Sequence, residues 1–315
     1  MASRQESLPT AALDRRPRGA RSKRDNHERS GWVLASPFFV LYFLFLLWPV
    51  LAAAWKSFFS DSLAGGNADF RALGNFGELV EDGDFWAAMW HTLWFTLLST
   101  PPLVLVPLVL ALFVNRVAKR QWLFRLAFFA PYVLPVSVVV LVWNWLYQPG
   151  FGLINGYLTK LGLAEVNWLG GEGIAMISVV ILTVWWTLGF SFVLFLAGLQ
   201  EIPRELDEAA ALDGTTTWQQ IRHITLPLLV PTTVLVAVLQ VIASLKVFDQ
   251  IYLLLEGGPN FATRPAIQYI YETGFTQYRV GYASALSFVF FLVIVAVSVL
   301  LFAGVRRIQR GTPPW

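Results

Sequence analysis

Cysteine is absent from this chain of 315 residues, and charged residues are scarce. Without Cys there can be no disulfide, metal–thiolate site or thiol nucleophile. The three histidines, at 27, 91 and 223, are far apart and no carboxylate pair accompanies them, so we predict neither a metal site nor catalytic residues. Charged residues make up only 14% of the chain and hydrophobic residues 56%. This is more apolar than a soluble core of this length can bury, which predicts an integral membrane protein.

The chain contains several long hydrophobic runs. Six stretches are long enough to cross about 30 Å of hydrocarbon at about 1.5 Å per residue. They lie near residues 33–55, 92–114, 123–147, 174–199, 228–254 and 280–304. The sequence therefore predicts an all-α integral membrane protein with six transmembrane helices.

Prolines occur inside two of these stretches. Pro101 and Pro102 fall in the second, and Pro131 and Pro135 in the third. Each removes a backbone hydrogen bond, so we expect both helices to be interrupted or bent there. Bent helices leave gaps that could form a pathway, although bending with a purely structural role is an equally good interpretation.

Basic residues gather on one side of the predicted topology. They are Arg15, Arg16, Arg18, Arg21, Lys23, Arg24 and Arg29 before the first span, Arg116, Lys119 and Arg120 after the second, and Arg306, Arg307 and Arg310 after the sixth. The positive-inside rule places these clusters in the cytoplasm. We expect residues 1–31 to form a disordered cytoplasmic tail, 32–305 the membrane domain and 306–315 a cytoplasmic C-terminal tail. The first tail could also bind anionic lipid or nucleic acid, but a tail that only sets topology is favoured, with membrane lipid and no nucleic acid as partner.

A polar cytoplasmic loop, residues 200–227, separates the fourth and fifth spans. Pro203 suits a first helical turn, and Gly214 supplies the left-handed conformation that ends a helix. Thr217 and Gln220 have the spacing of a capping box that starts a second helix. We therefore predict a helix, a tight turn at Gly214, and a second helix running into Pro227. An ordinary amphipathic connector would look similar.

The same loop carries a motif. It reads Glu208-Ala209-Ala210, then Gly214 four residues beyond the second Ala, then Ile224-x-Leu226-Pro227 after nine more residues. This resembles the EAA loop of permease subunits of ATP-binding-cassette (ABC) importers, in which the motif docks the ATPase. The resemblance implies a coupling site formed by Glu208, Ala209, Ala210, Gly214, Ile224, Leu226 and Pro227.

Further segments extend the similarity from about residue 31 to residue 305. They include Lys246-Val247-Phe248-Asp249, Gly257-Gly258-Pro259, Tyr269-Ile270-Tyr271-Glu272 and Gly281-Tyr282-Ala283-Ser284-Ala285. These look like the carbohydrate-uptake branch of the family, specifically its maltose-type first permease subunit, although relatives often carry Arg where Lys246 stands. Lys keeps the charge.

This family resemblance implies the assembly around the chain. It implies a type I ABC importer permease fold in a bacterial or archaeal plasma (inner) membrane, paired with a second homologous permease. Two cytoplasmic ATP-binding subunits would hold ATP and Mg, leaving no cofactor on this chain, and an extracytoplasmic sugar-binding protein would deliver cargo. A polyol or glycerol-phosphate is the alternative cargo.

Polar side chains inside the spans are candidates for the substrate path. Gln240 and Ser244 lie one turn apart in the fifth span, and Trp185, Trp186 and Thr187 lie near the centre of the fourth. Hydrogen-bonding groups beside indole faces suit a sugar's hydroxyls and apolar ring face. Alternatively, Gln240 bonds a neighbouring helix and the Trp pair faces lipid or packs.

Lys246 and Asp249 lie three residues apart toward the outer end of the fifth span. On one helical face they would form an intramembrane ion pair, because an unpaired charge there is costly. A structural pair is favoured over a transport site. An ion-coupled secondary transporter is the rival class, but it would need coupling-ion sites at mid-membrane; the sequence shows no unpaired acidic residue at the centre of a span and no internal repeat.

Overall fold

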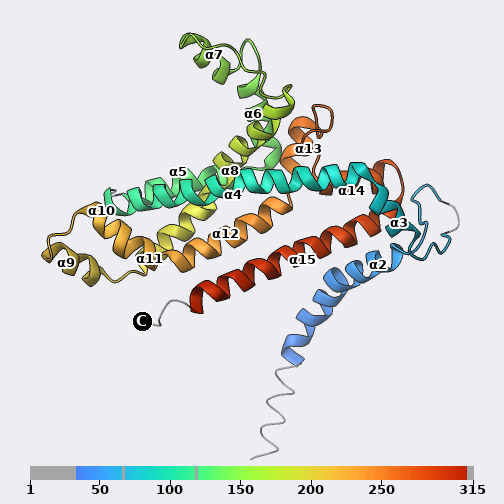
Figure 1. Ribbon diagram of the computed structural model, residues 1–315, viewed down its shortest axis with the longest axis horizontal. Coiled ribbons are helices and arrows are strands. Elements are labelled where there is room, and N and C mark those ends of the chain that lie inside the picture. Colours follow the sequence, from blue (N-terminus) through green and yellow to red (C-terminus); the bar gives the residue numbers. More distant parts are fainter. Residues whose placement is uncertain (1–32, 66–67, 118–119, 311–315) are drawn as a thin grey trace, which may run out of the picture. The chain divides into compact units, whose positions relative to one another are not determined.

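The computed structural model describes residues 33–65, 68–117 and 120–310. Its regular structure in these residues is helical, with one isolated β-bridge between Phe59 and Phe70. Helical residues 33–42 come first. The elements that follow, where η marks a π-helix, are η1 (Phe43–Leu47), α2 (Trp48–Lys56), α3 (Gly74–Glu81), α4 (Gly83–Val117), α5 (Gln121–Val133), α6 (Val136–Tyr147), α7 (Leu153–Lys160), α8 (Glu172–Gln200), α9 (Arg204–Leu212), α10 (Thr217–Gln220), η2 (Ile221–Thr225), α11 (Leu226–Leu228), α12 (Val230–Leu245), α13 (Asp249–Leu255), α14 (Ala266–Tyr271), η3 (Glu272–Thr276) and α15 (Val280–Arg310) (Figure 1).

Four helices among the described residues are long and apolar enough to cross a membrane. They are Val33–Lys56, Gly83–Arg116, Glu172–Gln200 and Val280–Gly304. Two more spans are possible if each of two bent pairs counts as one: Gln121–Val133 with Val136–Tyr147, bent by 96°, and Thr217–Leu228 with Val230–Leu245, bent by 63°. Four of the six predicted spans are therefore single helices, and the third and fifth are broken.

The prolines of the second and third spans have different effects. Helix α4 continues through Pro101 and Pro102, so these prolines do not interrupt the second span, and a bend there stays a prediction. Helix α4 packs against α8 and α12. In the third span α5 ends at Val133, and Leu134 is extended (φ −68°, ψ 138°). Leu134 precedes Pro135, and a residue before proline is sterically driven out of the α conformation.

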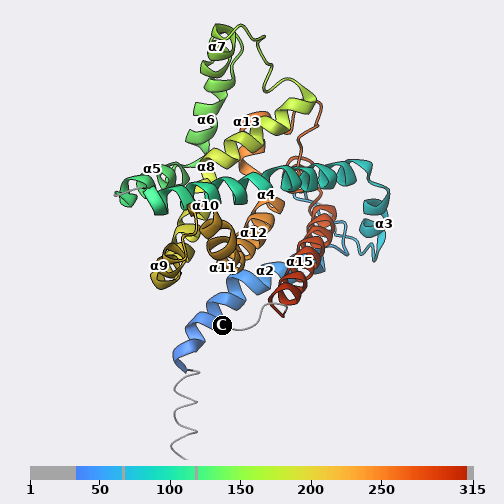
Figure 2. The same cartoon turned by 60° about the vertical axis from the view of Figure 1, so that its left-hand side comes forward.

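The chain divides into two compact units, residues 1–52 and 53–315. The described part of the first unit is apolar helix. In the second unit α8 packs against α4, α5 and α12. Both ribbon views show α8 crossing α4, and α7 at the far end of α6, away from α8 (Figures 1 and 2).

Two buried clusters hold α8 in place. Toward its C-terminal end, Phe192 and Phe195 pack with Leu108 of α4 and Val236 of α12. Toward its N-terminal end, the cluster joins side chains of α6, α8 and α13, including Val139, Trp143, Met176, Val179 and Ile251. Helix α8 is thus fixed at both ends by burial of apolar surface and close packing.

The fifth span is broken a second time near its end. Helix α12 stops at Leu245 and α13 begins at Asp249, so residues 246–248 are not helical. Lys246 and Asp249 are both exposed, and no ion pair joins them in the described structure. The predicted pair is therefore wrong, because it assumed one continuous helix.

A glycine permits a close approach between α5 and α8. A Cβ atom at Gly189 would lie 2.2 Å from the carbonyl oxygen of Phe128, which is backbone and cannot rotate away. Gly173, at the start of the same helix, has nothing within 4 Å of such an atom.

We expect Gly189→Ala to lower the stability of the folded chain by about 1–3 kcal/mol, because the two helices must separate. Gly173→Ala is the matched control and should be neutral or slightly stabilising, because Ala favours helix. Melting temperatures of the two detergent-solubilised variants check this. Equal melting of both variants and the parent would contradict the packing described here.

Candidate functional site

The turn at the end of α9 has the predicted geometry. The Thr215 N–H donates to the Ala210 oxygen and the Gly214 N–H to the Ala211 oxygen, both at 3.1 Å. Gly214 has φ +72°, the left-handed conformation that favours glycine. This pair of bonds is a Schellman motif, which satisfies carbonyls that the helix end leaves free. The predicted tight turn at Gly214 is confirmed.

The segment after this turn starts one residue earlier than predicted. The capping box is formed by Thr216 and Gln219: the Thr216 N–H donates to Gln219 Oε1 at 2.7 Å, and the Gln219 N–H to Thr216 Oγ1 at 3.4 Å. The predicted box at Thr217 and Gln220 is wrong. Gln220 instead donates to Thr215 Oγ1, at 3.3 Å.

Helix α9 offers an exposed surface. Ala210 is its one buried residue, whereas Glu208 and Ala209 are exposed and Leu212 is 90% exposed. Pro203 precedes the helix as its N-cap residue rather than lying in the first turn. Such a helix gains little stability from packing within its own chain. Its exposed surface can be covered by another protein.

The later motif residues connect the loop to the bundle. Ile224 lies in η2, and Leu226 and Pro227 begin α11. Leu226 packs against the buried cluster of α4, α8 and α12, while Pro227 is exposed. A cavity of about 570 Å³ lies between α9 and the ends of α4 and α8, with Glu208, Arg116 and Gln200 among its lining residues.

A second cavity, of about 290 Å³, lies in the middle of the second unit, and we call it the central cavity. Its lining residues come from five helices: Phe95 and Leu103 of α4, Tyr132 of α5, Thr183, Trp186, Thr187 and Phe190 of α8, Leu239, Gln240, Ala243 and Ser244 of α12, and Gln250 of α13. Four of the five side chains predicted for the substrate path, at 186, 187, 240 and 244, line it together. Trp185 does not. Its ring packs edge-on against Trp143, with ring centroids 5.7 Å apart.

Hydrogen bonds between helices fix the polar wall of the central cavity. Gln240 donates from Nε2 to Ser191 Oγ at 2.8 Å, and the hydroxyls of Ser244 and Ser99 are 2.9 Å apart. The alternative prediction, that Gln240 bonds a neighbouring helix, is therefore confirmed. It does not exclude the first, because Gln240 also lines the cavity.

Gln250 and Tyr132 were not singled out from the sequence. Gln250 reaches the central cavity because the chain leaves the helix at 246–248, and its Nε2 donates to Thr183 Oγ1 at 3.3 Å. Tyr132 stands two residues before the break at Leu134 and stacks on Phe190, with ring centroids 5.8 Å apart. The sequence analysis did not predict the helix break before Gln250, so it gave no signal for this residue.

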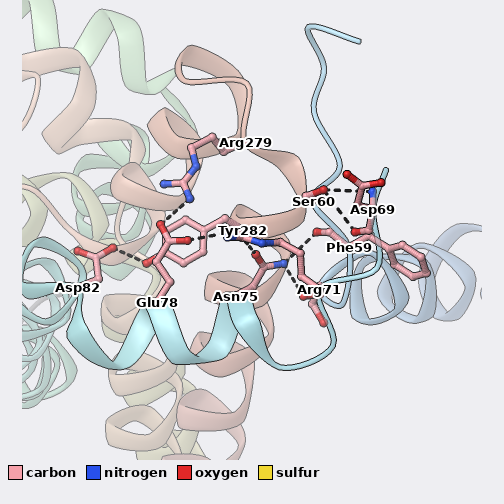
Figure 3. A network of polar contacts seen from close by, with 10 residues as sticks. Phe59, Ser60, Asp69, Arg71, Asn75, Glu78, Asp82, Arg279 and Tyr282 are labelled. Atoms are coloured by element: carbon pink, nitrogen blue, oxygen red, sulfur yellow. Dashed lines mark hydrogen bonds and ion pairs between the residues drawn. The ribbon is translucent and has the colours of Figure 1, made fainter. Parts of the chain in front are cut away.

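A polar network ties together α3, α4, α14 and α15, at the end of the bundle away from α9 (Figures 1 and 3). Asp82 Oδ2 accepts hydrogen bonds from the hydroxyls of Tyr269 and Tyr282, at 2.7 and 2.5 Å. Its Oδ1 accepts from the N–H groups of Asp84 and Phe85, both at 3.1 Å. Burial by itself raises the pKa of the Asp82 carboxyl, but these four hydrogen bonds outweigh it and hold the pKa below its usual value.

Two further groups of polar contacts lie at this end of the bundle. Glu78 pairs with Arg279 and Arg71, and the Asn75 amide donates to the backbone oxygens of Ser57 and Phe59 (Figure 3). The second group surrounds Arg264, a cation that the sequence analysis did not single out. Arg264 is 8% exposed, lies 3.5 Å from carboxylate oxygens of both Asp84 and Glu272, and its guanidinium stacks on the rings of Phe261 and Tyr269.

The described residues contain no cluster of three or more His, Asp or Glu side chains that could hold a metal ion.

Residues 76–312 match the family model "Binding-protein-dependent transport system inner membrane component". The chain belongs to this family. Its resemblance to permease subunits of ABC importers is thereby confirmed, and its relatives are transport subunits.

Three similar proteins show how widely this permease family is used. The chain is 33% identical over 275 residues to the sulfoquinovosyl glycerol transport system permease protein SmoG of Agrobacterium fabrum. The match covers 87% of this chain and 89% of SmoG. It is 32% identical over 283 residues to the trehalose/maltose transport system permease protein MalF of Thermococcus litoralis, covering 89% and 94%. A permease chain of a solved bacterial alginate ABC transporter, in complex with an alginate pentasaccharide-bound periplasmic protein, matches with a TM-score of 0.80 and 25% identity, covering 91% and 97%.

The Asp82 network of this permease predicts a pH-dependent stability. A carboxyl whose pKa is lower in the folded state contributes stability that is present above its unfolded pKa of about 4 and is lost as pH falls through the folded value. We therefore expect Asp82→Asn to lower stability by roughly 1–2 kcal/mol at pH 7, with a smaller difference from the parent below about pH 4. Melting temperatures across this pH range measure it. The exposed neighbour Glu81 provides the control, Glu81→Gln, and a pH-independent deficit in Asp82→Asn would contradict the account.

Proposed function

We propose that this chain is a transmembrane permease subunit of an ATP-driven sugar importer, in which it forms half of the translocation pathway. The observation that carries the proposal is the continuity between loop and cavity. Helix α8 lines the central cavity with Trp186 and Thr187 and leads directly into α9. Helix α12 lines it with Gln240 and Ser244 and follows directly from η2 and α11. A displacement of α9 therefore moves two walls of the cavity.

The mechanism follows from this connection. ATP binding closes the two cytoplasmic ATPase subunits, and the loop around Gly214 moves with them. Helices α8 and α12 tilt, so that the central cavity opens outward to receive sugar from the binding protein, and hydrolysis restores the inward-facing state. This chain performs no chemistry. ATP and Mg belong to the ATPase partners, which contact the loop at Glu208, Ala209, Ala210 and Gly214, while Ile224, Leu226 and Pro227 join the loop to α12.

The proposed assembly contains a second homologous permease, two ATPases and an extracytoplasmic binding protein. Support comes from the family and from the neighbour solved with its periplasmic protein. We propose six spans in the type I importer arrangement, with each bent pair crossing once, in a plasma (inner) membrane. We also propose that both termini are cytoplasmic, which the basic residues near them support through the positive-inside rule.

A secondary transporter fits the central cavity less well. Coupling to an ion needs a carboxylate or a similar ligand at mid-membrane. None of the twelve lining residues of the central cavity is acidic.

The first test concerns coupling through Gly214. No atom lies within 4 Å of a Cβ placed there, so a substitution changes the backbone preference without a clash. Gly214→Val disfavours the left-handed turn and should reduce ATP-driven uptake at least tenfold, because the docking helix is misplaced, while the subunit still inserts. Asn tolerates this conformation, so Gly214→Asn is the matched control and should retain most uptake. Normal uptake by Gly214→Val would exclude the docking role.

The second test separates the two roles of Gln240. Gln240→Leu removes a polar group from the central cavity together with the bond to Ser191, whereas Ser191→Ala removes the bond alone, since Ser191 does not line the cavity. Interhelical bonds in membranes average only about 0.6 kcal/mol, so both variants should assemble. We expect Gln240→Leu to lower sugar uptake several-fold and Ser191→Ala to leave it nearly unchanged. Equal uptake in both variants would remove Gln240 from the path.

The third test concerns orientation. The chain has no Cys, so single cysteines report position without background. Leu161 and Leu212 are 75% and 90% exposed, in the loop after α7 and at the end of α9. In intact cells, an impermeant thiol reagent should label Leu161→Cys but not Leu212→Cys, which should react only after permeabilisation. Labelling of Leu212→Cys from outside would overturn the orientation and the coupling role with it.

A further inference from the structure

The central cavity has no charged wall. Its lining is divided between aromatic and neutral polar side chains, with three aliphatic ones. The aromatic residues are Phe95, Tyr132, Trp186 and Phe190, and the polar ones are Thr183, Thr187, Gln240, Ser244 and Gln250. No Asp, Glu, Lys, Arg or His lines it. The lining therefore offers stacking and hydrogen bonding, but no ion pair.

Several of the donors in this wall are already used within the chain. One N–H of each glutamine amide donates, from Gln240 to Ser191 Oγ and from Gln250 to Thr183 Oγ1, and each amide keeps a second N–H. The indole N–H of Trp186 donates to the Leu134 oxygen at 3.3 Å. The hydroxyls of Thr183 and Thr187 donate to backbone oxygens of their own helix, at 2.7 and 2.8 Å.

The groups left for a ligand therefore include acceptors as well as the remaining amide N–H groups. Each glutamine carbonyl oxygen lacks a hydrogen-bond partner in the described structure, and neither is among the fully enclosed atoms without one. Carbonyl oxygens attract O–H donors and repel anions. A neutral polyhydroxyl compound supplies such donors, and its ring face can lie on Trp186 or Tyr132.

Lys246 lies between Ser244 and Gln250 in the chain, but it is exposed and does not line the central cavity. Arg264 is buried, but it is held by Asp84 and Glu272 and does not line the cavity either. A phosphate, sulfonate or carboxylate entering this space would lose its hydration and gain no charged partner from the lining residues.

We propose that the cargo crossing this permease is an uncharged sugar, and that Gln250 is a residue that determines this specificity. This inference rests on the proposed function and goes beyond it. Family membership alone does not decide the point, since named relatives transport sulfoquinovosyl glycerol as well as trehalose and maltose.

The test uses pairs of probes that match in size and differ in charge. Labelled maltose, trehalose and glucosyl glycerol are compared with maltose 6′-phosphate, trehalose 6-phosphate and sulfoquinovosyl glycerol. Each is offered to proteoliposomes that hold this chain with its partner permease and ATPases, ATP inside and binding protein outside. We expect ATP-dependent uptake of neutral members only, with the charged member of any transported pair at least tenfold slower.

Two outcomes contradict different claims. ATP-driven uptake of a charged probe at the rate of its neutral partner, or faster, overturns the inference and leaves the importer function standing. Uptake that follows an ion gradient and is indifferent to ATP refutes the proposed function itself.

Variants of Gln250 test whether this residue bonds the neutral cargo. Gln250→Glu keeps an acceptor of the same size, whereas Gln250→Leu removes it. With the transported neutral probe, we expect Gln250→Glu to stay within about threefold of the parent and Gln250→Leu to lose about tenfold, the effect of one hydrogen bond to cargo. Co-purification of the ATPases at parental yield controls for assembly. Parental uptake in Gln250→Leu, or an equal loss in both variants, would overturn the role of Gln250.

Discussion

Backbone hydrogen bonding in a bilayer is the constraint on which this structure depends. Hydrocarbon offers no partner to a free N–H or C=O group, so irregular backbone at membrane depth persists only where protein covers it or where it lines a cavity. Two of the helix breaks flank the central cavity. The break at Leu134 comes two residues after Tyr132, and the break at residues 246–248 lies between Ser244 and Gln250. The Trp186 indole N–H bonds the Leu134 oxygen at one of them. These two breaks therefore bring side chains of the cavity together.

The route from the loop to the cavity depends on two helices. Helix α8 is held at both ends by buried clusters and at its middle by the close contact of Gly189 with α5. It leads into α9, whose end is fixed by the Schellman motif at Gly214. Helix α12 returns from the loop after a 63° bend and a π-helical turn. A rigid element and a bent one thus connect the exposed loop to the cavity wall, which suits a subunit that converts a domain motion into alternating access.

The sequence predicted those features that depend on local chemistry or on long apolar runs. Gly214 as a left-handed turn and four single spans are confirmed, because a positive φ and a hydrophobic length are each specified by the residues themselves. The capping box was displaced by one residue because Thr216–Gln219 and Thr217–Gln220 have the same spacing, and only the geometry of the turn selects between them. Helix α4 continues through Pro101 and the fifth span breaks after Leu245, and neither feature follows from the local residue pattern. Lys246, Asp249, Gln250 and Arg264 could not be placed for that reason.

The central claim is that ATP hydrolysis by partner subunits drives cargo through this chain. The most direct measurement is the initial uptake rate in proteoliposomes containing the complete complex, with luminal ATP and the ion gradient varied independently. We predict uptake that requires ATP and the binding protein and that persists when ionophores collapse every ion gradient. Uptake that stops with the gradient while ATP remains, or that continues after ATP is removed, would contradict the account.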